Sequence, residues 1–89
     1  MPTMRVYWRR SKQGIRLILS DGEHEEEVGG VRKTPRGYDA FARTFGYDPS
    51  RAQRDIASED EARVFVEGFR PWELFKGGAG LRVERDVVE

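Results

Sequence analysis

Cysteine is absent from this sequence, and histidine occurs only once. Without thiols the chain has no disulfide framework, no zinc–thiolate site and no cysteine nucleophile. No apolar run approaches the roughly 18 residues of a membrane span. The N-terminus, MPTMRVYWRR, lacks the apolar segment of a signal peptide. We therefore expect a cytoplasmic protein with no membrane partner.

Asparagine is also absent, and arginine outnumbers lysine 13 to 3. Few thermolabile residues and 36% charged residues fit a thermophilic source, although a GC-rich genome alone favours arginine over lysine. At 89 residues the chain is long enough for one hydrophobic core but not for two. We expect a single folded domain over residues 1–89.

The chain has no excess of either charge, because 16 basic residues balance 16 acidic ones. This balance disfavours a sequence-independent nucleic-acid binder, which normally has a basic excess. The charges are nonetheless segregated along the chain. Residues 1–20 carry five basic and no acidic side chains, whereas residues 21–27 (DGEHEEE) carry five acidic and no basic ones.

Alternating apolar residues predict two strands, over residues 4–10 and 15–20, separated by the polar segment SKQG. A register that pairs Arg10 with Ile15 places all the larger apolar groups on one side. It pairs Trp8 with Leu17 and Val6 with Leu19. A three-residue loop with Gly14 in the left-handed region would slip the register by one residue, and burial disfavours that slip.

Asp21-Gly22 predicts a two-residue hairpin turn that leads into a third strand. This turn pairs Arg16 with Glu27, Ile18 with Glu25 and Leu19 with His24. The acidic segment then lies beside a basic strand, where opposite charges attract. Gly29-Gly30 is expected to bulge or end the third strand.

Two helices are expected to follow. Thr34-Pro35 resembles an N-cap and first helical position, and an apolar stripe (Tyr38, Phe41, Ala42, Phe45) extends to Gly46. Ser58 and Glu61 form a capping box before a second stripe (Ala62, Phe65, Val66, Phe69), which Pro71 interrupts. Leu81, Val83 and Val87 suggest a last strand. The predicted class is α+β: a small, mainly antiparallel sheet of three to four strands (β-β-β-α-α-β) with two helices packed on one face.

The stretch RVYWRR suggests a nucleic-acid site on the sheet face opposite the core. An exposed aromatic ring stacks on a base while neighbouring cations hold phosphates. The residues of this site are Arg5, Tyr7, Arg9, Lys12, Arg16, Arg32, Lys33 and Arg36. The alternative, which we favour, is a surface in which Glu25 and Glu27 neutralise Arg9 and Arg16 while Tyr7 packs across from Ile18.

The remaining chemistry-bearing residues predict neither a metal site nor a catalytic site. His24 lies among carboxylates, but the chain has no second histidine and no EF-hand spacing. The segment GGAG (77–80) lacks the lysine of a phosphate-binding loop. We expect no cofactor, no metal and no enzymatic activity.

The segment GFRPWELF (68–75) suggests a protein interface, because arginine and tryptophan are enriched at interface hot spots. The candidate residues are Arg70, Trp72 and Phe75. A small core also needs its aromatics, so Trp72 fits the core better and Phe75 is the better candidate for exposure. The function expected first is a non-enzymatic interaction or regulatory module that binds another protein or itself as a homodimer. Nucleic-acid binding is the second choice.

Overall fold

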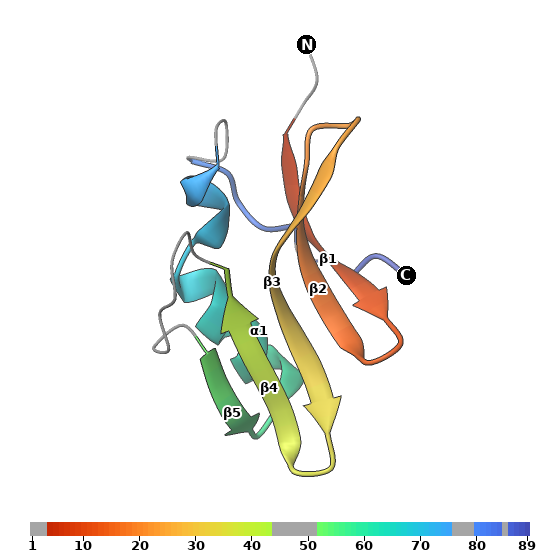
Figure 1. Cartoon of the computed structure of the whole chain (residues 1–89), viewed down its shortest axis with the longest axis vertical. Helices are drawn as coiled ribbons and strands as arrows, with labels where there is room; N and C mark the ends of the chain where they lie inside the picture. Colours follow the sequence, from red (N-terminus) through yellow and green to blue (C-terminus); the bar gives the residue numbers. More distant parts are fainter. Residues whose placement is uncertain (1–3, 44–51, 76–79, 85) are drawn as a thin grey trace.

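The structure is a computed structural model that describes residues 4–43, 52–75, 80–84 and 86–89. In these ranges a five-stranded antiparallel sheet in meander order is followed by one bent helical segment that packs on it (Figure 1). The α+β class is confirmed. The elements are β1 (Arg5–Ser11), β2 (Gly14–Ser20), β3 (Glu25–Thr34), β4 (Gly37–Ala42), β5 (Ala52–Ile56), α1 (Glu59–Gly68) and the 3-10 helix η2 (Pro71–Leu74).

The predicted first helix is wrong, because its first half forms the strand β4. Pro35 and Arg36 make a two-residue turn, in which the Thr34 hydroxyl accepts a hydrogen bond from the Arg36 N–H and donates one to the Gly37 carbonyl. Ala40 and Ala42 then face the core with a period of two. The predicted C-terminal part of this helix, Phe45 and Gly46, lies outside the described residues.

The predicted register of the first hairpin is confirmed, with Val6 opposite Leu19, Trp8 opposite Leu17 and Arg10 opposite Ile15. Val6, Trp8, Leu17 and Leu19 all lie in the core cluster. Burial of the larger apolar side chains on one face therefore sets this register.

The predicted two-residue turn at Asp21-Gly22 is wrong. The turn spans residues 21–24, because the Asp21 carboxylate accepts hydrogen bonds from the backbone N–H groups of Glu23 (2.9 Å) and His24 (2.7 Å). Ser20 therefore pairs with Glu25 in the β2–β3 ladder. The predicted strand register, with Arg16 directly opposite Glu27, does not form.

A register shift follows in the same ladder, since Ile18 pairs with Glu27 but Leu17 pairs with Gly29. Val28 is the extra residue of this bulge, and its side chain is fully buried. The bulge expected near Gly29-Gly30 is thus confirmed, whereas the end of the strand there is not, because β3 continues to Thr34.

Helix α1 begins as predicted, with the Ser58 hydroxyl accepting a hydrogen bond from the Glu61 N–H at 3.1 Å. Ala62 and Val66 are buried against the sheet. Gly29 permits this approach, since a Cβ at that position would lie 2.7 Å from Val66 Cγ1. α1 therefore covers the face of the sheet that carries Trp8, behind β4 in the view of Figure 1, and we call the opposite face the outer face.

Pro71 ends the helix as predicted, after Arg70 in a left-handed conformation (φ 49°). The chain then forms η2, which buries Trp72 in the core cluster.

Within the described residues 80–84 and 86–89, the predicted C-terminal strand is present as two isolated parallel bridges, Val6–Val83 and Arg9–Val88. Backbone hydrogen bonds link Glu84 to Val6 and Val88 to both Trp8 and Arg10. The end of the chain thereby covers part of the free edge of β1 (Figure 1). This cover reduces the exposed edge that would otherwise pair with another strand.

Candidate functional site

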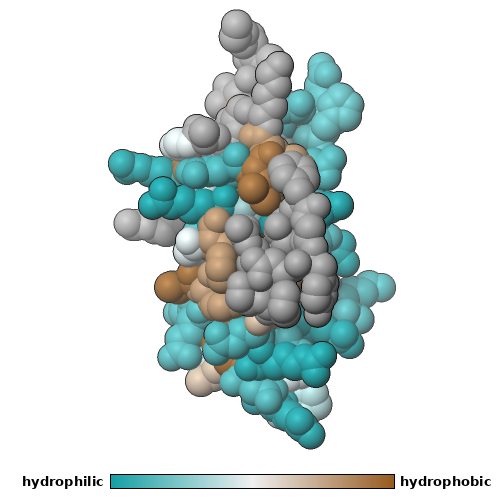
Figure 2. All heavy atoms as spheres, turned by 60° about the vertical axis from the view of Figure 1, so that its left-hand side comes forward, coloured by the Kyte–Doolittle hydropathy of each residue, from teal (hydrophilic) through white to brown (hydrophobic). Residues whose placement is uncertain are grey.

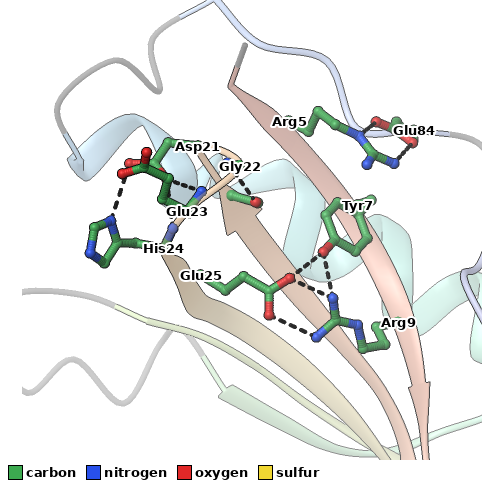
Figure 3. Close-up of polar contacts among 10 residues, drawn as sticks. Arg5, Tyr7, Arg9, Asp21, Gly22, Glu23, His24, Glu25 and Glu84 are labelled. Atoms are coloured by element: carbon green, nitrogen blue, oxygen red, sulfur yellow. Dashed lines mark hydrogen bonds and ion pairs between the residues drawn. The ribbon is translucent and has the colours of Figure 1, made fainter. Parts of the chain in front are cut away.

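The outer face of β1 carries a closed polar cluster of Tyr7, Arg9 and Glu25 (Figure 3). Arg9 binds the Glu25 carboxylate with both terminal nitrogens, at 3.0 and 2.5 Å. The Tyr7 hydroxyl donates to the same carboxylate at 2.7 Å and accepts from Arg9 at 2.6 Å. Each of the three side chains therefore contacts the other two.

These contacts change the acidity of the groups. Hydrogen bonds from Arg9, and then from Tyr7, lower the pKa of Glu25 to about 2. Burial, followed by the hydrogen bond to Glu25, raises the pKa of Tyr7. The cluster is thus built around an ionised carboxylate and a protonated phenol.

The nucleic-acid interpretation needs an exposed ring at Tyr7, but this residue is only 4% exposed. The guanidinium carbons of Arg5 and Arg9 lie 4.7 and 5.4 Å from the ring centre. Arg5 is itself bound to Glu84 through two hydrogen bonds, at 2.6 and 2.8 Å (Figure 3).

Arg16 also has a carboxylate partner, since it lies 3.6 Å from Glu27. The alternative interpretation of RVYWRR as half core and half ion-paired surface is therefore confirmed. Tyr7 lies directly across from Ile18, as that interpretation expects.

Three other predicted nucleic-acid residues come together at one end of the sheet. Lys12, Arg32 and Lys33, with Arg10 and Glu59, line a cleft of about 440 Å³ that we call the basic cleft. Gly14 pairs with Arg32, and the Lys33 N–H donates to the Gln13 carbonyl at 2.8 Å. Residues 18 and 20 positions apart in the sequence are thus held side by side.

Arg36 does not join this cleft. It lies in the β3–β4 turn beside a separate hollow that Asp39, Arg54 and Asp55 also line. The eight residues of the predicted nucleic-acid site therefore do not form one surface, although Arg16 and Arg32 line a common hollow.

The three predicted protein-interface residues also lie in different environments. Trp72 is 5% exposed, so its assignment to the core is confirmed. Arg70 is exposed and lies 4.0 Å from Glu73, and Phe75 is half-buried against the core. Figure 2 views the side on which α1 and β5 lie and shows hydrophobic areas interrupted by hydrophilic side chains.

His24 is exposed in the β2–β3 turn, with Nδ1 3.7 Å from the Asp21 carboxylate. Backbone hydrogen bonds in this turn lower the pKa of Asp21. Asp21 therefore holds the turn. In the described ranges no three histidine, aspartate or glutamate side chains form a group suited to a metal ion.

Phe41 is a surface residue that the sequence analysis placed in a helix core. It is 43% exposed on the outer face and pairs with Gly30 of β3. A Cβ on Gly30 would lie 2.7 Å from the ring, so the ring covers the glycine. Strict alternation with Ala40 and Ala42 is the sequence pattern that would have revealed this orientation.

No family model matches the chain, and neither a curated protein nor a solved structure is similar to it. Among the described residues, no helix has the length and apolar character needed to cross a membrane.

Proposed function

We propose that this protein is a small, non-enzymatic interaction module whose partner is another protein, a second copy of the chain included. The exposed ring of Phe41 on the outer face of β4 carries the proposal. Among the residues that the structure describes, the other large apolar side chains that are exposed are Val64 and Val88. A ring left on the surface among polar groups is typical of an interface anchor.

The surroundings of Phe41 support the same function. A hollow of about 140 Å³ beside the ring is lined by Arg16, Glu27, Gly30 and Arg32 among others. Arginine and aromatic residues are enriched at interfaces, and the two charge signs here offer complementary pairing to a partner. We call Phe41 with these four residues the Phe41 patch.

The patch is tested by photo-crosslinking. A photoreactive phenylalanine analogue at position 41 is expected to give one discrete adduct, in purified protein or in host extract. The matched control carries the same analogue at position 64, where Val64 is 68% exposed on α1. An adduct of twice 10.3 kDa identifies a second copy as the partner.

The same experiment has a clear contrary outcome. If position 41 gives no discrete adduct, or gives the same adducts as position 64, the Phe41 patch is not the interface. Arg16→Ala should also weaken the position-41 adduct, because it removes a cation from the rim of the patch.

The second candidate function is nucleic-acid binding. Its original form needs an exposed ring at Tyr7 and free guanidinium groups at Arg5, Arg9 and Arg16. The ion pairs to Glu84, Glu25 and Glu27 oppose that form. The cations of the basic cleft favour nucleic-acid binding through phosphate contacts at that cleft instead of on the outer face.

A further inference from the structure

The basic cleft concentrates positive charge in a chain whose net charge is zero. Four cationic side chains (Arg10, Lys12, Arg32, Lys33) and one carboxylate (Glu59) line it. Arg10 is bound to Glu59 at 3.2 Å, which neutralises one cation. Lys12, Arg32 and Lys33 form no ion pair with a described residue, in contrast to Arg5, Arg9 and Arg16.

The backbone around these cations is fixed. The tip of the β1–β2 hairpin is hydrogen-bonded to the end of β3 through Gln13 and Lys33. Gly14 lies so close to the Val31 carbonyl that no side chain fits there. The cations thus project from a rigid base, although their own side chains are long and exposed.

The chemistry of the cleft points to an anion rich in oxygen. Guanidinium presents a planar set of donors to phosphate oxygens, and ammonium adds compact charges. No aromatic side chain is among the described residues that line the cleft, and these residues offer no ring on which a base would stack. Contacts of this kind hold phosphates without selecting a base sequence.

We propose that the basic cleft binds phosphate groups, as they occur along a nucleic-acid strand. This inference goes beyond the proposed protein interaction. The two sites share Arg32, whereas Lys12 and Lys33 line only the basic cleft and Phe41 lines only the patch. Loss of phosphate binding in Lys12→Ala with Lys33→Ala therefore leaves the crosslinking result at position 41 unchanged, and failure of that crosslinking leaves phosphate binding unchanged.

The test is an amide-resolved NMR titration of the full chain with a 12-nucleotide single strand of mixed sequence. We expect shifts concentrated at Lys12, Gln13, Arg32 and Lys33. With two or three phosphates neutralised, affinity falls about 7- to 20-fold between 50 and 200 mM salt. A second arm with inorganic triphosphate separates the two sources: a strand site binds triphosphate more weakly, whereas a site for free phosphates binds it at least as tightly.

Variants of matched charge give the decisive comparison. Lys12→Ala with Lys33→Ala is expected to lower affinity about tenfold or more and to reduce the salt dependence. Arg54→Ala with Arg82→Ala removes the same charge from exposed sites outside the cleft and should change affinity much less. Glu59→Gln should raise affinity, because it removes the carboxylate from the cleft wall.

Three results would overturn the proposal. The first is a silent spectrum with both the strand and triphosphate. The second is equal weakening by the two double variants. The third is binding of a poly-glutamate peptide of equal charge as tightly as the strand, which would make the cleft a general acidic-peptide site. Both double variants change exposed side chains, and their amide spectra report directly whether each remains folded.

Discussion

Trp8→Ala is expected to lower the free energy of unfolding by about 3–5 kcal/mol. Trp8 is fully buried in the core cluster, directly opposite Leu17 of β2. Its indole N–H also donates to the Glu67 carboxylate of α1 at 3.0 Å, so one side chain ties the helix to the sheet. Truncation leaves a cavity and removes that link.

Urea unfolding of the variant and the parent protein measures this loss. Val64→Ala is the control, because that side chain is exposed and its loss should change stability by no more than about 0.5 kcal/mol. Trp8→Phe keeps most of the packing and should fall between the two. A loss below about 1 kcal/mol for Trp8→Ala would show that the tryptophan is not in the core.

Gly14→Ala is expected to destabilise the protein by about 1–3 kcal/mol. A Cβ at Gly14 would collide with the backbone carbonyl of Val31 on the neighbouring strand, and a backbone atom cannot rotate aside as a side chain does. β2 and β3 would have to separate at this point. The same movement would displace the hairpin tip that forms one wall of the basic cleft.

Gly68→Ala is the matched control, since a Cβ there meets no atom within 4 Å. Alanine in the last turn of α1 should be neutral or should stabilise the helix by up to about 1 kcal/mol. Thermal unfolding of the two variants side by side separates steric collision from a general effect of losing glycine. Equal melting temperatures would contradict the close approach of Gly14 and Val31.

The sequence predicts the register of the N-terminal hairpin well, because the alternation of apolar residues and the burial of the large side chains favour the same register. The alternation of Val6 and Trp8 and the need to bury them against Leu17 and Leu19 allow one register. The start of α1 is equally well specified by Ser58 and Glu61.

The sequence does not predict β4, because its apolar residues fit both the 3.6-residue period of a helix and the two-residue period of a strand. Tyr38, Phe41 and Ala42 fit a helical stripe, while Ala40 and Ala42 fit a strand. Pairing with β3 decides between them, and that interaction lies beyond local sequence. Gly37 has a positive φ of 141° and lies close to the Ile56 carbonyl, a conformation and contact that favour glycine.

The sequence identifies several residues of the candidate sites, but it does not show which of them lie together in the structure. Which arginine meets which glutamate depends on the four-residue turn at 21–24 and on the bulge at Val28. The predicted register would place Gly14 opposite Gly29, whereas the observed one places it opposite Arg32. The basic cleft exists only in the observed register.

Ion pairs hold the outer surface of RVYWRR, and the pKa of Glu25 reports on them. The group has a folded-state pKa of about 2, below its ordinary value of 4.5, so it stabilises the fold above pH 4.5. That contribution is lost as the pH falls from 4.5 towards 2.

The measurement is a pH titration of the Glu25 side-chain carboxyl carbon by NMR, in the parent protein and in Arg9→Gln. We expect a midpoint near 2 in the parent and a clear rise in Arg9→Gln, because the largest cause of the lowered pKa is the hydrogen bond from Arg9. A midpoint near 4.5 in both proteins would show that these contacts to Glu25 do not form, and Arg9 and Tyr7 would then be free to meet a ligand.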